Sequence, residues 1–299
     1  MSSLPRYNRG VAGTPGSSPS TILVISPHLD DAVLSIGGSI AAWTAAGHRV
    51  VVASVYTTGP PLAEVAPSMR KFADYATRRA EDAAACASVG AEPRYLDQIE
   101  RAFRKPYLRG WSFFATPGDR DGFAGLVAAT RALAPLAELD PAQILIPLGI
   151  GNHVDHVETL IAATDFALAH DWLDRLRFYE DFYALSGRMR RRHPVTRGKS
   201  WSSWQAPLLG ARLLAVVLQT VAAAGRGPEA LRFLAPELRG ATWTVECSPI
   251  DVTRKLAAIA CYASQTRAFG GLAGIARATR AYHRWWGEAE PLWRAEQQG

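Results

Sequence analysis

Cysteine is scarce in this chain, and its scarcity removes one large class of proteins. The 299 residues include three cysteines, Cys86, Cys247 and Cys261. They are too few and too widely spaced for a disulfide framework, and no two of them form a Cys-x-x-Cys pair. A reducing compartment fits this usage, so we expect a cytoplasmic protein.

Long apolar runs are also missing, and we expect no signal peptide in the first residues. Residues 1–20 are rich in glycine, serine and proline without an apolar centre, which predicts a flexible tail and argues against a signal peptide. The most apolar stretch, residues 207–221, is shorter than the ~20 residues that span a bilayer and contains Arg212 and Gln219. We expect a buried helix there, with peripheral membrane contact as the alternative, and no stable membrane insertion.

Positive charge is in excess but is not concentrated. The net charge is +6, yet the basic residues are spread along the chain and form no stripe with interleaved aromatics, so we expect no nucleic-acid partner. With 48% hydrophobic residues and no internal repeat or linker, residues 21–299 are predicted to form a single domain. The partner expected is a small molecule, and the sequence leaves a homo-oligomer open.

An apolar run of strand length opens the domain and ends abruptly in polar residues. Residues 21–25 are uniformly apolar after Thr21 and are followed closely by His28, Asp30 and Asp31, then by a helix-like segment that Gly47 ends. This pattern predicts a buried parallel strand whose carboxyl end carries polar groups. Open α/β sheets bind their ligands at that edge.

A second polar group follows another buried-looking strand. Residues 143–148 precede a glycine-rich turn and then His153, Asp155 and His156. Further strands are predicted at residues 49–55, 94–96, 177–183 and 242–247, with helices at about 66–89, 122–138, 155–170 and 251–266 and from Leu272 onward. The predicted fold is therefore α/β, with a Rossmann-like, mostly parallel sheet flanked by helices and a helical C-terminal elaboration.

The first turn argues against a dinucleotide-binding protein. Such a protein needs a Gly-x-Gly-x-x-Gly turn to admit a pyrophosphate, whereas this chain has Asp30 and Asp31 after the first strand. Two carboxylates would repel a diphosphate. Imidazole and carboxylate are instead the ligands of a divalent metal site, with a spare carboxylate available as a base.

The two polar groups together resemble the paired signature of the PIG-L / LmbE-like zinc-dependent de-N-acetylases. The similarity includes an arginine-rich element and two C-terminal elements, in the order of the family. Its segments are residues 27–31, 78–81, 153–156, Lys255 and 262–265. The chain departs from the usual first motif: Pro27 precedes the histidine, Leu29 replaces a proline and Ala32 replaces a glutamate. The lost acid alters the surroundings of the metal and leaves the ligands intact.

The resemblance implies one zinc ion per chain, although an Asp-His-His site could accept another divalent metal. His28, Asp31 and His156 match the zinc ligands of the family. Three protein ligands leave a position for water and for the substrate amide oxygen, as catalytic zinc sites require.

The same resemblance assigns roles in the reaction, the hydrolysis of an N-acetyl group on an amino sugar. Asp30 matches the general base, His153 the histidine that stabilises the oxyanion in its protonated form, and Asp155 the acid that holds that histidine. The expected substrate is a small N-acetylated metabolite or glycoconjugate. Amidase action on a thiol conjugate of the mercapturate type and a sugar-binding module without turnover remain the alternatives.

Residues that contact the substrate are harder to assign. Arg78 matches a family arginine near the pocket. Asp97 and Arg104 are predicted only from their place after the third strand, in an irregular segment of residues 97–122 rich in arginine and aromatics. The basic residues 188–193 are either a solvated loop or an attraction for an anionic substrate.

Overall fold

The first predicted strand lies inside the sheet, between two parallel neighbours. The computed structural model describes residues 18–104, 116–182, 189–190, 193–197, 230–267 and 271–296. Within these ranges one seven-stranded sheet has the order β3-β2-β1-β4-β5-β7-β6. The strands are β1 (Thr21–Ser26), β2 (Arg49–Thr58), β3 (Glu92–Ile99), β4 (Gln143–Pro147), β5 (Leu176–Tyr179), β6 (Thr242–Ser248) and β7 (Glu290–Glu296). Strands β1 to β5 are parallel, and β7 runs antiparallel to both β5 and β6.

The strand order reverses at β1. The chain passes outward from β1 to β2 and β3, then returns to β4 on the other side of β1. Ligands of open α/β sheets bind at such a switch point, outside the carboxyl ends of the two adjacent strands. The polar residues that follow β1 and β4 therefore start side by side at one edge of the sheet.

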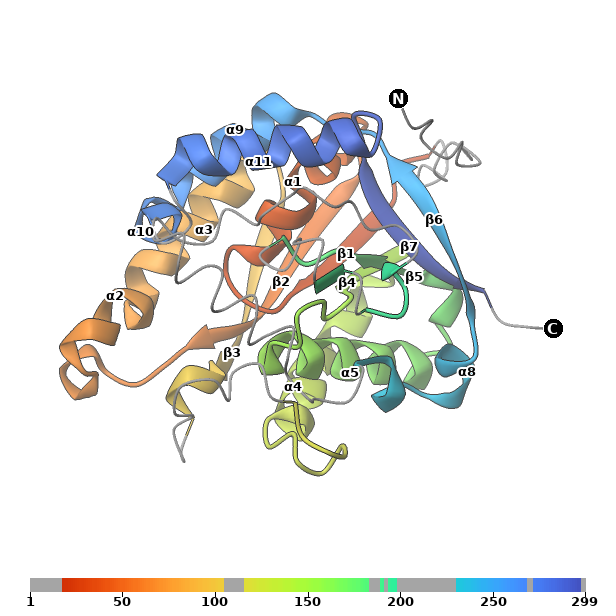
Figure 1. The fold of residues 1–299 in the computed structure, drawn as a ribbon, viewed down its shortest axis with the longest axis horizontal. Helices are drawn as coiled ribbons and strands as arrows, with labels where there is room; N and C mark the ends of the chain where they lie inside the picture. Colours follow the sequence, from red (N-terminus) through yellow and green to blue (C-terminus); the bar gives the residue numbers. More distant parts are fainter. Residues whose placement is uncertain are drawn as a thin grey trace.

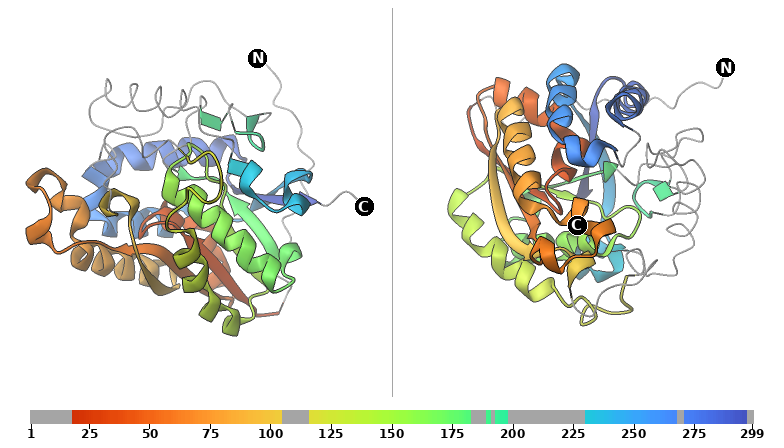
Figure 2. Two further views of the ribbon diagram at one scale, coloured as in Figure 1. Left: turned by 90° about the horizontal axis from the view of Figure 1, so that it is seen from below. Right: turned by 90° about the vertical axis from the view of Figure 1, so that its left-hand side faces the viewer.

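Helices cover both faces of the parallel part of the sheet (Figures 1 and 2). The helices are α1 (Asp31–Ala45), α2 (Arg70–Ala73), α3 (Tyr75–Val89), α4 (Leu126–Leu133), α5 (Val154–Ala169), α8 (Pro236–Arg239), α9 (Val252–Cys261), α10 (Ala263–Thr266) and α11 (Gly271–Trp285). Helices α1, α3, α9 and α11 lie on one side, and α4 and α5 on the other. Residues 22–25 of β1 are 0% exposed, because helices cover both faces of this strand.

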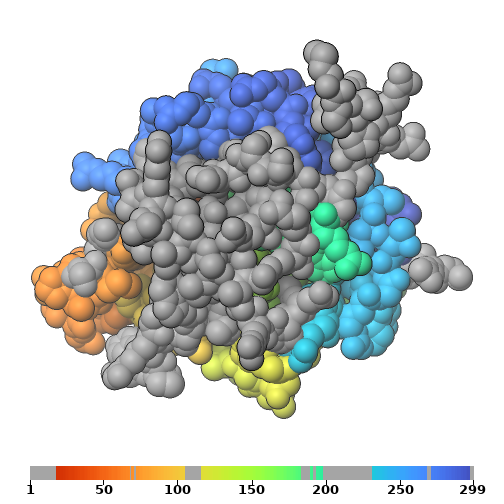
Figure 3. Space-filling model, viewed as in Figure 1, coloured from red at the N-terminus to blue at the C-terminus, as the bar shows by residue number. Residues whose placement is uncertain are grey.

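The space-filling view shows the face seen in Figure 1. The α2 region (orange), the segment before α4 (yellow) and the α8 region (cyan) lie along its outer edges (Figure 3). None of the described helices has the length and apolar character needed to cross a membrane.

A buried carboxylate from the C-terminal strand holds helix α1. Ile36 has non-helical dihedral angles, so α1 kinks there. After the kink, Glu290 accepts hydrogen bonds from the backbone N–H of Ser39 (2.7 Å) and from the Lys255 ammonium (2.6 Å). A side chain on Gly38 would lie 2.9 Å from Ile250 and 3.1 Å from the Glu290 carboxylate, so glycine permits this approach. The helix that begins with Asp31 is thereby anchored to β7.

Helix α3 is joined to the C-terminal part by two polar contacts. The Tyr262 hydroxyl donates to Asp82 (2.8 Å), and both the backbone N–H and the hydroxyl of Ser264 donate to Glu81 (2.8 and 2.6 Å). The segments of residues 78–81 and 262–265, which are far apart in the sequence, therefore lie together.

The predicted fold class is confirmed, with differences in single elements. The expected helix of residues 66–89 is interrupted at Asp74, which accepts a hydrogen bond from the Thr77 N–H and so begins α3. The helix expected to end at Glu138 changes after Leu133 to a 3-10 turn (Ala134–Leu139) with a proline near its start. The helix expected from Leu272 onward ends at Trp285, and β7 follows it. The C-terminal part is therefore helical only in part. Its last described residues form a strand because they pair with β5 and β6.

Several predicted segments lie outside the described residues in whole or in part. They are the N-terminal tail as far as residue 17, the apolar stretch 207–221, residues 105–115 of the predicted substrate loop, and residues 188, 191 and 192 of the basic segment. The single-domain boundaries stay a prediction.

Replacing Glu290 should destabilise the protein strongly. Glu290→Ala leaves the buried Lys255 ammonium without its carboxylate partner, and breaking a buried pair in this way costs about 3–5 kcal/mol. We expect that loss in the free energy of unfolding measured with urea. The matched control is Glu296→Ala, on the same strand but exposed, which should change little. Equal effects of the two variants would contradict the anchoring role of Glu290.

The buried Asp82 should make stability depend on pH. Burial raises the pKa of Asp82 to about 7, from about 3.8. A carboxyl whose pKa is higher in the folded state stabilises the fold below the unfolded pKa, and this contribution is lost as the pH rises toward 7. Asp82→Asn should therefore be more stable than the wild type at pH 8, by up to about 4 kcal/mol from a shift of about three units, with the advantage vanishing near pH 4. Denaturant unfolding at both pH values tests this, and a constant difference would contradict it.

Candidate metal centre

The polar residues after β1 and β4 meet at the beginnings of two helices. Asp31 is the first residue of α1, and His153 is the N-cap of α5. The turn after β1 is held by Ser26, whose hydroxyl donates to the His28 carbonyl (2.6 Å) and accepts from the Ala32 N–H (3.0 Å). The strand ends and these turns bring the two predicted groups together.

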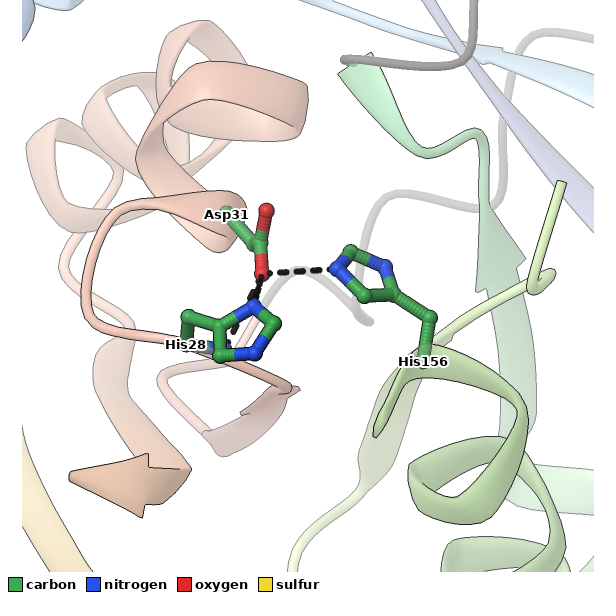
Figure 4. A group of neighbouring side chains, drawn as sticks. All are labelled: His28, Asp31 and His156. Atoms are coloured by element: carbon green, nitrogen blue, oxygen red, sulfur yellow. Dashed lines mark hydrogen bonds and ion pairs between the residues drawn. The ribbon is translucent and has the colours of Figure 1, made fainter. Parts of the chain in front are cut away.

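One carboxylate oxygen joins the two groups (Figure 4). Oδ2 of Asp31 lies 2.9 Å from Nδ1 of His28 and 3.1 Å from Nε2 of His156. The three side chains are buried, and their potential ligand atoms lie within 4.8 Å of one another. The three residues expected to bind zinc thus converge on one point.

The electrostatics of this cluster fit a cation. Burial alone lowers the pKa of His28, but Glu100, Asp155 and Asp31 raise it well above its usual value near 6.5. For His156, burial alone would also lower the pKa. Asp31 and Asp181 outweigh this effect and raise the pKa to about 9. The surrounding acids therefore favour positive charge at this point. A divalent ion suits this donor set of two nitrogens and one carboxylate oxygen.

A second group of donors lies on the other side of His28. Nε2 of His28 is 3.1 Å from Oδ2 of Asp155, and His153 completes a group within the same 4.8 Å limit. The rings of His28, His153 and His156 form a triangle with centroid distances of 5.2 to 5.3 Å. The two candidate groups therefore share His28.

Asp155 is fixed by several donors. Its Oδ2 also accepts from the Arg101 backbone N–H (3.0 Å), and its Oδ1 pairs with Arg104. The Asp155 backbone N–H donates to Nδ1 of His153 (3.3 Å). Asp155 was expected to hold His153 with its carboxylate. Its carboxylate is hydrogen-bonded to His28, and its backbone N–H donates to His153. The functional role expected for Asp155 stays a prediction.

The surroundings of His153 favour a neutral ring. Burial lowers its pKa to about 3, and the nearby Asp155 carboxylate only partly opposes this effect. The resemblance implies a protonated ring instead. Because Nδ1 accepts a hydrogen bond, the proton of the neutral ring lies on Nε2.

Asp30 precedes the candidate ligand Asp31, and its side chain does not cap helix α1. It is the N-cap residue by position, yet its side chain makes no capping hydrogen bond. Burial and the neighbouring Asp31 raise its pKa to about 6, which Arg78 and His28 partly oppose. A carboxylate with a pKa near neutrality suits a general base.

The residues predicted to bind substrate have different surroundings. Arg78 is buried and donates to the Phe72 carbonyl and to Glu100 (both 2.9 Å). Arg104 pairs with Asp155 and with Glu158, the latter at 2.7 Å. Asp97 has a side chain that is 63% exposed and pairs with Arg79. Arg78 and Arg104 thus contribute to ion pairs around the candidate metal ligands. Asp97 lies inside β3 and not after it, because the strand continues to Ile99.

Sequence reasoning missed the acids that surround the histidines. Asp181 lies after β5, with Oδ1 at 2.6 Å from Nδ1 of His156. Glu100 lies 3.9 Å from Nε2 of His28, and Glu158 accepts hydrogen bonds from Tyr56 (2.6 Å) and the Gly125 N–H (2.6 Å). The signal for Asp181 was a pair of acids directly after a strand, the pattern that drew attention to Asp30 and Asp31.

The chain is similar in structure to several solved deacetylases. A teicoplanin-pathway deacetylase, solved as a bog complex, has a TM-score of 0.65 and 20% identity, with 93% of this chain and 99% of that chain covered. The A40926 pseudoaglycone deacetylase has a TM-score of 0.60 and 23% identity, with 94% and 99% covered. At these identities the likeness shows a common fold. No curated protein matches the chain significantly.

The sequence was also compared with models of protein families, and one of them matches. Residues 23–167 match the family model PIG-L, described as GlcNAc-PI de-N-acetylase, a hydrolase of amide bonds. This range is nearly half of the chain and contains most of β1, all of β4 and both histidine groups. The predicted family resemblance is confirmed over this part. Residues 23–167, which include the candidate metal ligands, are therefore similar to the PIG-L family of de-N-acetylases.

Proposed function

We propose that the chain is a metal-dependent hydrolase that removes an N-acetyl or other N-acyl group from an amino sugar in a small metabolite or glycoconjugate. One observation carries the proposal. The ligand atoms of His28, Asp31 and His156 converge within 4.8 Å of one another, and Asp30 lies next to Asp31 with its carboxylate unused as a helix cap. A metal donor set and a base therefore stand together.

His28, Asp31 and His156 would hold one divalent ion, and the resemblance makes that ion zinc. A metal in this position would lower the pKa of a bound water and polarise the carbonyl of the acyl group. One solved teicoplanin deacetylase carries the description "zinc inhibited form". We therefore keep the identity of the active metal open to other divalent ions.

Asp30 would transfer the proton in both halves of the reaction. It takes a proton from the attacking water as the new C–O bond forms. It then gives that proton to the leaving amine as the C–N bond breaks, and the acetic acid formed loses its own proton, so that acetate and a protonated amine result. Its pKa of about 6 suits both duties, since it is ionised at pH 7 yet basic enough to accept a proton.

His153 would stabilise the oxyanion as a neutral donor. Its Nδ1 accepts from the Asp155 backbone N–H, so Nε2 carries the proton that can be donated to the acyl oxygen. A neutral imidazole can act in this way when its surroundings lower its pKa, as happens in triosephosphate isomerase. Asp155 would position the neighbouring His28 and the start of α5.

The substrate is proposed by class. The similar structures are named for teicoplanin and for the A40926 pseudoaglycone, and both names include a deacetylase activity. We therefore include such compounds among the candidates for this chain. Arg78, Arg104 and Asp97 remain the proposed contacts. Hydrolysis of a mercapturate-type conjugate and sugar binding without turnover remain the alternative functions, and a cytoplasmic location stays a prediction.

The three proposed ligands should be required for metal binding. His28→Ala, Asp31→Ala and His156→Ala should each lose bound metal, because each removes one of three protein donors. Metal analysis after dialysis against a limited zinc supply measures this. His170→Ala is the matched control, since that histidine caps the far end of α5 and contacts Phe166. Full metal occupancy in all three ligand variants would refute the proposed centre.

Asp30 and His153 should be needed for turnover and not for the metal. Asp30→Ala should slow hydrolysis by about 10²–10⁴-fold, and His153→Ala by about 10²–10³-fold, with metal content and fold retained. The measurement is acetate release from a panel of N-acetylated amino sugars, antibiotic pseudoaglycones and mercapturates. Release from mercapturates alone would favour the amidase alternative. Binding of sugars without any release would favour the binding module.

A further inference from the structure

We propose that Asp181 is a positioning residue that orients His156 and raises the affinity of the metal centre. The inference rests on the proposed function, because it concerns the same metal. Asp181 lies after β5, which is the neighbour of β4 in the sheet. No family element seen in the sequence includes it.

Both oxygens of Asp181 have a fixed partner. Oδ1 lies 2.6 Å from Nδ1 of His156, and Oδ2 accepts a hydrogen bond from the Ile150 N–H at 2.8 Å. The side chains of Asp181 and His156 are 0% and 2% exposed. Water therefore does not compete for these contacts, and the carboxylate cannot rotate without losing one of them.

The contact with Asp181 decides which nitrogen of His156 faces the metal group. A carboxylate accepts hydrogen bonds, so Nδ1 carries a proton and donates it to Oδ1. The other nitrogen, Nε2, lies 3.1 Å from Oδ2 of Asp31 and is the atom available to a metal. A carboxylate behind a ligating histidine fixes the tautomer, holds the ring and increases its basicity.

Asp181 also holds the turn that leads to His156. Ile150 lies between Gly149 and Gly151, which adopt positive φ angles of 72° and 92°. Glycine adopts such angles without strain, so the turn itself has little rigidity of its own. The hydrogen bond from Ile150 to Asp181 ties this turn to the same carboxylate that holds His156. One side chain thereby fixes both the ligand and its approach.

The neighbouring acid serves a different purpose and provides a control. Glu180 is buried as well, but its carboxylate accepts from Arg190 (2.8 Å), Tyr282 (2.7 Å) and Trp293 (3.0 Å). It joins β5 to α11 and β7. Two adjacent buried carboxylates thus separate attachment of the C-terminal part from support of the metal ligand.

The test measures metal affinity on the purified full chain after metal removal. Zinc is titrated against a chromogenic chelator for the wild type, Asp181→Ala, Asp181→Asn and Glu180→Gln. Asp181→Ala should weaken zinc binding by about 10–100-fold, the usual effect of removing such a partner. Asp181→Asn should weaken zinc binding less than Asp181→Ala does. The amide oxygen of asparagine can still accept from one of the two donors, whereas alanine accepts from neither. Glu180→Gln should leave the zinc affinity unchanged even where it lowers the melting temperature of the metal-free protein.

Each outcome has a clear meaning. Unchanged zinc affinity in Asp181→Ala, while His156→Ala loses the metal, would overturn the inference and leave the proposed centre intact. Equal losses in Glu180→Gln and Asp181→Ala would also overturn it, since general loosening would explain both. If Asp181→Ala fails to fold, the isosteric Asp181→Asn decides by the same criterion. Zinc retained by His156→Ala itself would instead refute the proposed metal centre.

Discussion

The site depends on the contact between the Asp31 carboxylate and two buried imidazoles. Asp31 begins α1, and His156 lies in α5. One oxygen atom of Asp31 is nevertheless about equally far from the rings of His28 and His156. The acids around the two rings raise the pKa of both imidazoles. Removing three charged groups from water is costly unless each is paired, so this arrangement persists only because the partners are complete.

The rest of the structure supports that contact from several directions. The strand order places β1 and β4 side by side, so their polar ends meet without long loops. Glu290 holds the second half of α1, while Arg104 and the Arg101 N–H hold Asp155 at the start of α5. A rigid frame of this kind is what a metal site needs to keep its ligands in place. The C-terminal part therefore contributes to the site through anchoring, although the histidine motifs end at residue 156.

Much of the fold could be predicted because its signals are local. The run that forms β1 is apolar and ends in acids and a histidine, and the same pattern recurs at β4, so the site residues could be chosen from neighbouring letters. Strand β7 could not be predicted in this way, since its pairing with β5 and β6 joins distant segments. Asp181 was missed because its partner His156 is distant in sequence and its role exists only in the folded chain. The lowered pKa of His153 depends on burial, which the sequence does not display.

The position of the bound metal tests the account most directly. His28 belongs to two candidate groups, one with Asp31 and His156 and the other with His153 and Asp155. Anomalous diffraction at the zinc edge, on crystals grown with one equivalent of zinc, would locate the ion. The account predicts one peak bound by His28, Asp31 and His156, with Asp30 and His153 left as non-ligands. A single peak bound by His153 and Asp155 would contradict it, because the proposed oxyanion donor would then be a metal ligand.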